Sequence, residues 1–238
     1  MRFSVLFAAV CATALTTGVG AIAKAPPAAP PSEADWRTPD PQNVLVIDTS
    51  KGRVFVELAP LVAPATVARV RDLARSGFYD GRAFFRVIDG FMDQTGDPQD
   101  NGQGGSTLPN LPPEFTFRRG ASTPMVTVTK TNGLDAGFVG SLPVLSQGMD
   151  LSVLTADNKV KAWGTFCPEV AGMARADAPD TGNSQFFLMR ELHGDLDQKY
   201  TPFGRAIGGL DVIRSIKTGE PPAPPMDTMT KVATISGR

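Results

Sequence analysis

The sequence predicts a mainly β fold, a closed β-barrel with helices capping it. Many short β-rich runs, separated by turn residues, follow one another along the 238 residues, and only two segments show clear helical signals. Hydrophobic residues make up 42% of the chain and charged residues 20%, as in globular domains with a substantial core. Short strands and two helices that share one core favour a closed barrel with helical caps.

Residues 1–23 have the features of a secretory signal peptide that is removed from the mature protein. A basic Arg2 precedes an apolar run, and Ala21-Ile22-Ala23 fits the A-x-A pattern of a cleavage site. An uncleaved membrane anchor and a lipid-modified Cys11 are the alternatives, although the apolar run is short for a membrane span. The Pro/Ala-rich residues 24–42 predict an extended linker. We therefore expect an exported protein, in a periplasm or alternatively an endoplasmic lumen, without stable membrane insertion after cleavage.

The folded domain is predicted to span residues 43–238 and to begin with a hairpin and a helix. Residues 43–58 (NVLVIDTSKGRVFVEL) contain two β-rich runs with Lys51-Gly52 at the turn. Residues 64–77 (PATVARVRDLARSG) repeat apolar side chains at helical spacing. Pro64 fits the first turn of this helix and Gly77 fits a C-terminal cap.

The later elements are short. Residues 84–94 predict two strands bent at Asp89-Gly90, and residues 209–217 predict the second helix. Four further segments are predicted to be strands: residues 125–130, 151–163, 185–189 and 231–236. Residues 151–163 are predicted to form a hairpin that turns at Asp157-Asn158.

Several classes of function are disfavoured by the composition and motifs. A net charge of −1 and a pI near 5.9 argue against nucleic-acid binding. The glycine loop at residues 101–105 lacks the third glycine of a dinucleotide fingerprint and opens no helix, so we expect no nucleotide. The single histidine, His193, lies in a polar loop without a nucleophile motif, and one Asp180-Thr181-Gly182 cannot form the paired aspartates of an aspartic protease. We expect no metal or other cofactor, and with Cys11 cleaved off, Cys167 leaves no internal disulfide.

One arginine stands out, because Arg86 lies in an otherwise apolar strand (FFRVIDGFMDQTGD, residues 84–97). Charged side chains are rarely buried without a partner. Few other titratable groups accompany it, which suits a reaction that needs neither proton transfer nor a nucleophile. By the two-residue period of a strand, Phe84 and Arg86 share a face, which Met92 and Gln94 can join after the bend.

These residues resemble the cyclophilin family. Residues 84–97 are similar to its signature F-H-R-x-I-x-G-F-M-x-Q-x-G-D, and NGQGG, MARADAPDTGNSQFF and LDQKYTPFGRAIGGLDVI resemble later family segments in the same order. The resemblance covers roughly residues 43–120 and 169–236, so residues 121–168 are predicted to be an insertion, such as an extra hairpin. It implies a closed eight-stranded antiparallel barrel capped by two helices, and peptidyl-prolyl cis–trans isomerase activity on proline-containing polypeptides.

The resemblance also implies roles for individual residues. Arg86 would be the catalytic donor, since a guanidinium stays charged and offers a rigid donor fork. Gln94 would hydrogen-bond the substrate backbone, Gln185 lies near the pocket, and Arg175 and Ala176 would pair with the bound peptide. The proline pocket would be lined by Phe91, Met92, Phe186, Leu196 and Phe203. Three positions depart from the family pattern: Phe85 and Tyr200 replace histidines, Tyr200 still among the substrate-binding residues, and Asp195 replaces a tryptophan.

Two other interpretations stay open. The chain could be a cyclophilin-fold module that binds peptides or client chains with incidental turnover, or a structural part of an envelope complex that uses residues 121–168 as its interface. A monomer is the expected oligomeric state.

Overall fold

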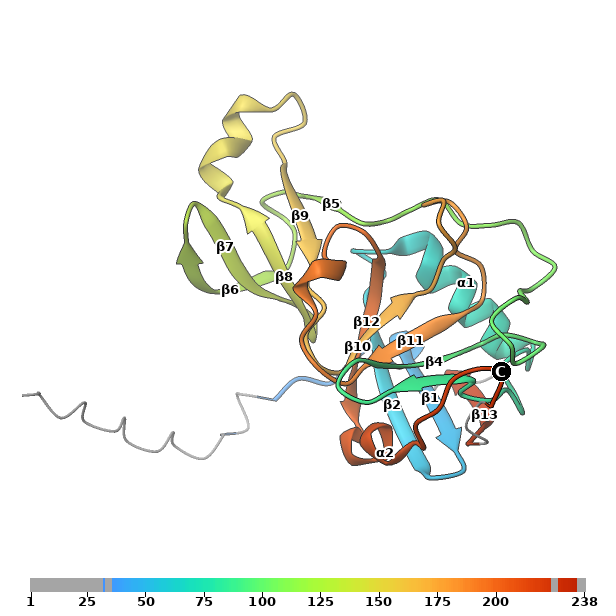
Figure 1. Cartoon of the computed structure of the whole chain (residues 1–238). Helices are drawn as coiled ribbons and strands as arrows, with labels where there is room; N and C mark the ends of the chain where they lie inside the picture. Colours follow the sequence, from blue (N-terminus) through green and yellow to red (C-terminus); the bar gives the residue numbers. More distant parts are fainter. Residues whose placement is uncertain (1–31, 33–35, 224–226, 235–238) are drawn as a thin grey trace, which may run out of the picture. The chain divides into compact units, whose positions relative to one another are not determined.

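The structure, a computed structural model, describes residue 32, residues 36–223 and residues 227–234 (Figure 1). The predicted signal peptide at residues 1–23 lies outside the described residues, as does most of the predicted linker at residues 24–42. Thr38–Arg238 forms one compact unit. In the described part of the chain, no helix has the length and apolar character needed to cross a membrane.

An eight-stranded antiparallel sheet is the centre of the fold, with strand order β13-β1-β2-β12-β10-β11-β4-β3. The predicted first hairpin is confirmed as β1 and β2, which turn at Ser50 and Lys51. The strands are β1 (Val44–Thr49), β2 (Gly52–Leu58), β3 (Arg86–Ile88), β4 (Met92–Thr95), β10 (Val170–Met173), β11 (Phe186–Met189), β12 (Thr201–Gly208) and β13 (Met229–Thr234).

The sheet is an open half-barrel, so the prediction of a closed barrel is wrong. No ladder joins its edge strands β13 and β3 among the described residues; single bridges pair Ala83 with Thr228 and Val87 with Gly219. β3 is only three residues long, because the chain turns back at Gly90, whose φ of 68° suits glycine. The free side of β3 pairs with Gly219, in the segment between α2 and β13, and not with β13 itself. The sheet is therefore left open.

Two α-helices contribute to the core on this sheet. α1 (Pro64–Arg75) begins at Pro64 and is followed by Gly77 with a φ of 73°, as the sequence predicts. α2 (Leu210–Ser215) is shorter than predicted, because the chain becomes extended at Ile216. Both helices bury side chains in the cluster that holds Leu45, Ile47, Phe186 and Phe203. Their role as caps of the barrel stays a prediction.

Residues 117–164 build a second antiparallel sheet, with strand order β5-β9-β8-β7-β6. Its strands are β5 (Phe117–Arg119), β6 (Met125–Thr131), β7 (Leu134–Val139), β8 (Leu142–Gln147) and β9 (Val160–Gly164). The prediction of a strand at residues 125–130 is confirmed. The predicted hairpin over residues 151–163 is wrong, because Met149–Leu154 forms the 3₁₀ helix η3 and only β9 is a strand.

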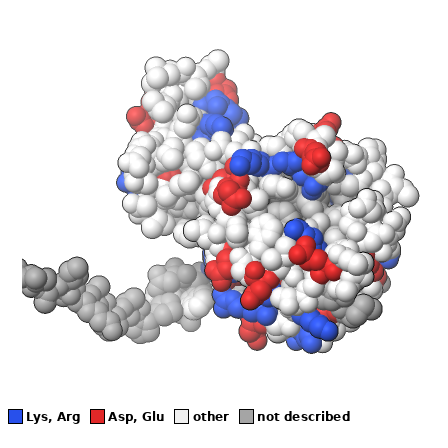
Figure 2. All heavy atoms as spheres, viewed as in Figure 1, with Lys and Arg blue, Asp and Glu red and all other residues white. Residues whose placement is uncertain are grey.

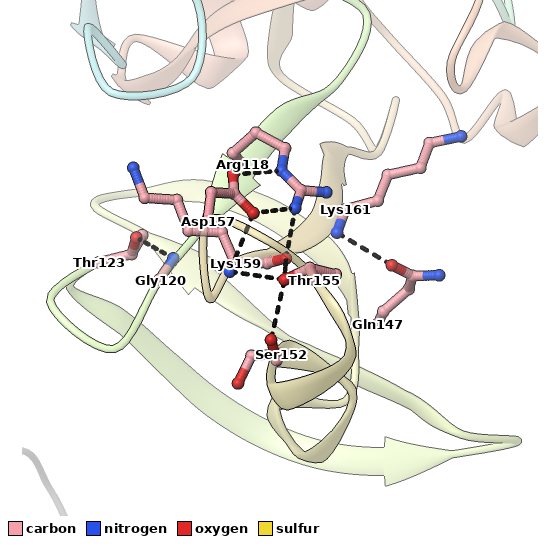
Figure 3. Close-up of polar contacts among 9 residues, drawn as sticks. All are labelled: Arg118, Gly120, Thr123, Gln147, Ser152, Thr155, Asp157, Lys159 and Lys161. Atoms are coloured by element: carbon pink, nitrogen blue, oxygen red, sulfur yellow. Dashed lines mark hydrogen bonds and ion pairs between the residues drawn. The ribbon is translucent and has the colours of Figure 1, made fainter.

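Polar contacts fix the turns of this second sheet, as Figure 3 shows. Arg118 on β5 donates from Nε to Asp157 at 3.0 Å and from Nη2 to the carbonyl of Lys159 at 2.5 Å. The Thr155 hydroxyl donates to the carbonyl of Ser152 and accepts from the amide of Lys159. The segment after η3 is thereby held against β5, although it contains no strand before Val160.

The second sheet packs one face on the first. Val139, Leu142, Val144 and Ala162 are buried in one cluster with Phe166, Val170 and Phe187. Residues 121–168 are therefore part of a continuous core and not a loose loop.

Candidate active site

A cavity of about 120 Å³ brings most of the predicted site residues together. It lies where β3, β4 and β11 meet the segments that follow β10 and precede β12. Its lining consists of Arg86, Phe91, Met92, Gln94, Ala174, Arg175, Phe187, Leu196 and Tyr200. Seven of these nine are predicted site residues, and Ala174 and Phe187 are additions.

The β3–β4 turn places Arg86 and Gln94 side by side. The two strands pair Arg86 with Gln94 and Ile88 with Met92, so Arg86 lies directly opposite Gln94 across the ladder. Nη1 of Arg86 lies 3.5 Å from Oε1 of Gln94. The sequence folds this way because the turn at Gly90 reverses the chain after only three residues of β3.

Hydrogen bonds orient both side chains. Nε of Arg86 donates to Oε2 of Glu220 at 2.9 Å. Nε2 of Gln94 donates to Oε1 of Gln185 at 2.9 Å, and Nε2 of Gln185 donates to the carbonyl of Gly104 at 2.7 Å. Glu220 is a site residue that the sequence analysis missed, since 134 positions separate it from Arg86.

Aromatic rings form the apolar wall of the cavity. The ring of Phe91 packs on His193 with centroids 4.6 Å apart, and Nε2 of His193 hydrogen-bonds the carbonyl of Gly90 at 3.0 Å. Phe187 contacts Tyr200 edge-on at 5.9 Å. Two arginines complete the lining, Arg86 and Arg175, and the guanidinium of Arg86 is anchored by Glu220, which does not line the cavity.

Phe186 and Phe203 are corrections to the predicted pocket. Both are fully buried in the core under the sheet, where the ring of Phe186 meets Tyr79 at 5.4 Å and Phe203 at 5.9 Å. Phe187 lines the cavity instead. Strand alternation explains the exchange, because β11 pairs Phe187 with Gln94 and Phe186 with Thr95. The same two-residue period, applied to the sequence, would have selected Phe187.

A second, polar cavity of about 300 Å³ adjoins the first and holds the remaining predicted residues. Ala176 and Gln185 line this second cavity, whereas Gln94, Ala174 and Arg175 line both. Its wall includes the glycine loop, which Asp97 shapes by accepting from the amides of Gln99, Asn101 and Gly102. The predicted substrate-binding residues thus span two connected cavities.

Behind the site, Asp93 points from β4 into the core. It is fully buried, and its Oδ1 accepts from Nε of Arg190 at 2.5 Å. Burial raises the pKa of Asp93 to about 7, although the Arg190 guanidinium opposes the shift. Arg190 also donates from Nη2 to the carbonyls of Ile213 and Ile216, which connects β4 to the end of α2.

The charge on the surface is mixed. Figure 2 shows acidic and basic side chains interspersed over the face drawn there, without one extended area of either sign. This distribution fits the formal net charge of −1.

Comparisons with known proteins agree with this geometry. A family model described as cyclophilin type peptidyl-prolyl cis-trans isomerase matches residues 44–235. A probable peptidyl-prolyl cis-trans isomerase of Brucella suis is 31% identical over 191 residues, which cover 76% of this chain and 74% of the relative. A peptidyl-prolyl cis-trans isomerase of Arabidopsis thaliana is 30% identical over 177 residues, which cover 74% of this chain and 21% of that protein.

Solved structures show the same fold. A cyclophilin from Hirschia baltica superposes with a TM-score of 0.79 and 36% identity, covering 87% of this chain and 82% of its own. Residues 121–168 make up about a fifth of the chain, more than the 13% that this match leaves out, so it takes in at least part of that segment. A cyclophilin-type isomerase from Cryptosporidium parvum, solved in the presence of the dipeptide Ala-Pro, has a TM-score of 0.55 at 20% identity and covers 80% of this chain and 98% of its own.

Proposed function

The chain belongs to the cyclophilin-type peptidyl-prolyl cis-trans isomerases, and from this premise we propose that Arg86 catalyses rotation about X-Pro bonds in exported polypeptides. The observation that supports this role is a single cavity in which the Arg86 guanidinium faces the apolar side chains of Phe91, Met92, Phe187 and Leu196. The site needs no nucleophile and no proton transfer.

The reaction has one physical obstacle. Twisting a peptide bond removes its resonance, which sets a barrier of about 18–20 kcal/mol. In the twisted state the proline nitrogen regains its lone pair and becomes a hydrogen-bond acceptor. A catalyst must therefore hold the proline ring, exclude water and donate to this nitrogen or to the preceding carbonyl.

The cavity meets each requirement in the proposed complex. The apolar wall holds the proline ring. Met92 and Phe187 form the buried side of the cavity, because both residues also pack in the hydrophobic core. Arg86 supplies the donor from its terminal nitrogens, because its Nε is occupied by Glu220. Gln94 hydrogen-bonds the substrate backbone, and the Ala-Pro dipeptide used with the Cryptosporidium parvum relative fits the same substrate class.

We also propose that the protein acts as a monomer in the periplasm, after loss of residues 1–23. The basic Arg2, the apolar run and Ala21-Ile22-Ala23 support export. Intact-mass measurement of protein recovered from a periplasmic extract tests this part, and a chain that still begins at Met1 would contradict it.

The catalytic proposal is tested by NMR exchange of a short Ala-Pro peptide with the mature protein and with Arg86→Ala. Removal of a well-placed electrostatic donor slows catalysis by roughly 100- to 1000-fold. Arg86→Lys keeps the charge but loses the planar fork, so we expect it to recover little of the rate.

Arg53→Ala is the matched control. Arg53 is also a strand arginine in an exposed ion pair, with Asp48 at 2.6 Å, and it lines neither cavity. Full activity in Arg53→Ala and loss in Arg86→Ala are the expected results. A native protein that binds the peptide without accelerating exchange would instead favour the peptide-binding module.

A further inference from the structure

The second sheet has an apolar face that the first sheet does not cover. Strand alternation buries Val139, Leu142 and Val144 on one side of the sheet. The alternate residues Phe138, Pro143 and Leu145 are half-buried on the other side. Cross-strand pairing arranges the apolar part of this outer face in two rows, Val126-Phe138-Pro143 and Thr129-Ala136-Leu145-Trp163, beside a more polar row, Thr131-Leu134-Gln147. Only Thr129 is polar among the seven residues of the first two rows.

Part of this face is hollowed into a groove of about 450 Å³. Phe138, Pro143 and Leu145 line it from the sheet, and Val128 and Leu192 border it with 68% and 64% of their surface exposed. Asp197 is its one charged lining residue. Contiguous apolar surface of this kind marks interaction sites in proteins that are otherwise well packed.

The groove lies beside a free strand edge. β6 is the last strand of its sheet and pairs with no strand on its outer side within the described part of the chain. A bulge between Thr127 and Thr129 leaves Val128 as the extra residue. An extended peptide uses such an edge for main-chain hydrogen bonds and places alternate side chains in the adjacent groove.

The groove and the cavity of about 120 Å³ beside Arg86, called the proline cavity below, are lined by consecutive residues of one segment. Leu196 lines that cavity and Asp197 lines the groove, and consecutive Cα atoms lie about 3.8 Å apart. Asp197 is held in place, since it accepts from the amide of Phe166 at 2.9 Å. An extended polypeptide advances about 3.3 Å per residue, so six residues beside a bound proline reach roughly 20 Å from the cavity.

We propose that the groove binds an extended apolar segment of the same polypeptide whose proline occupies the cavity. This inference rests on the proposed isomerase function and adds the substrate class: unfolded chains with apolar residues near the proline. A second copy of this chain fits the groove less well. A stable dimer covers about 800 Å² per partner, whereas the groove holds only a few side chains.

Peptide pairs test the proposal. Each peptide carries Ala-Pro and a six-residue extension of alternating Leu and Ser, or of Gly and Ser as the control, placed before or after the proline. We expect kcat/KM to be roughly tenfold higher for the Leu-Ser extension on one of the two sides, which corresponds to about 1.4 kcal/mol. Equal values for all peptides overturn the proposal.

A matched pair of variants locates the effect. In Val128→Asp the ratio between the Leu-Ser and Gly-Ser peptides should fall toward one, because a carboxylate disfavours apolar contact in the groove. Val153→Asp is the control, because Val153 is 78% exposed on η3 and lies outside the groove. An unchanged ratio in Val128→Asp, or an equal loss in Val153→Asp, contradicts the assignment.

A binding readout separates this proposal from the isomerase itself. In a Trp36→Phe background Trp163 is the single tryptophan, on the same face as Leu145. A Leu-Ser peptide without proline should change its fluorescence, and Val128→Asp should abolish the change. If the peptide leaves the Trp163 fluorescence of both proteins unchanged, the proposed binding in the groove is overturned, even when isomerase activity is present. Light scattering that finds a dimer broken by Val128→Asp assigns the groove to a second copy and overturns the proposal as well.

Discussion

The guanidinium of Arg86 is held by Glu220, whose Oε2 accepts from Nε at 2.9 Å. The backbone fixes this pair, because Gly219 exchanges two hydrogen bonds with Val87, at 2.8 and 2.9 Å. The connector after α2 therefore brings a carboxylate to the outer edge of the arginine, and the opposite edge is left for Gln94 and the cavity.

Loss of this carboxylate should reduce turnover more than binding. We expect Glu220→Ala to lower kcat about two- to fivefold with little change in KM, because exposed ion pairs contribute about 0–1 kcal/mol. Glu220→Gln keeps an acceptor for Nε and should retain most of the rate. The measurement is kcat and KM for an Ala-Pro peptide, with Asp48→Ala, which removes the partner of Arg53, as the control. An unchanged kcat in Glu220→Ala would show that Arg86 needs no outer partner.

Adjacent phenylalanines on β11 should separate stability from binding. Phe186→Leu removes edge-on ring contacts with Tyr79 and Phe203, so we expect a loss of stability of about 1–3 kcal/mol with KM unchanged. Phe187→Leu changes the cavity wall, so we expect a higher KM and a smaller loss of stability. Urea unfolding and peptide kinetics on both variants measure these effects. The reverse pattern would return Phe186 to the pocket.

Much of the central sheet could be predicted from local sequence, but its closure could not. The hairpin at residues 43–58 and α1 have strong turn and cap signals in Lys51-Gly52, Pro64 and Gly77, and all three fit the structure. Closure depends on which segment meets the free side of β3. That contact goes to Gly219, far along the chain, and no local pattern indicates it.

The second sheet was only partly predictable. Gly137 and Pro143 argue against strands by composition, yet both lie in strands. Glycine is needed at position 137, because a Cβ there would overlap with the carbonyl oxygen of Val126 on β6. The hairpin expected at residues 151–163 failed because Arg118 holds the loop at Asp157, a long-range contact that propensity does not encode.

The candidate site was predictable where one motif contains it. Arg86, Phe91, Met92 and Gln94 belong to one continuous stretch, and all four line the cavity. Glu220 is fixed only by tertiary structure, so no signal in the sequence could have indicated it.

Arg175 should favour acidic residues next to the proline. Its guanidinium lies 4.6 Å from the Tyr200 ring and donates from Nε to the carbonyl of Lys199 at 3.0 Å, which holds it in the wall shared by both cavities. Arg175 and Arg86 are the charged residues in the lining of the cavity of about 120 Å³, and Arg86 is already paired with Glu220, so Arg175 is left to interact with an acidic substrate side chain. We therefore expect Glu-Pro peptides to react faster than Lys-Pro peptides.

Arg175→Gln should reduce this Glu-Pro to Lys-Pro ratio about two- to fivefold, the size of an exposed charge interaction. High salt should reduce it in the native protein, since salt screens exposed charges. Arg53→Gln serves as the control. A ratio that Arg175→Gln leaves unchanged would mean that the residue acts only through its backbone.

Asp93 should make stability depend on pH. Burial raises its pKa from 3.8 to about 7, so the folded protein keeps a proton that the unfolded chain releases near pH 4. The folded state then binds more protons between these values, and the free energy of unfolding should fall as pH rises from about 4 to about 7. Each unit by which folding raises the pKa of Asp93 corresponds to roughly 1.4 kcal/mol of unfolding free energy lost across this pH range.

Asp93→Asn removes the titrating group while its side-chain oxygen still accepts from Arg190. Urea unfolding of both proteins between pH 4.5 and pH 7.5, in roughly unit steps across the window that linkage gives, measures the difference. Burial also raises the pKa of Asp100 and Asp197, which adds a slope of the same sign to both proteins. We therefore expect a shallower slope in Asp93→Asn and not a flat one. Parallel slopes would mean that Asp93 stays ionised beside Arg190 throughout this range.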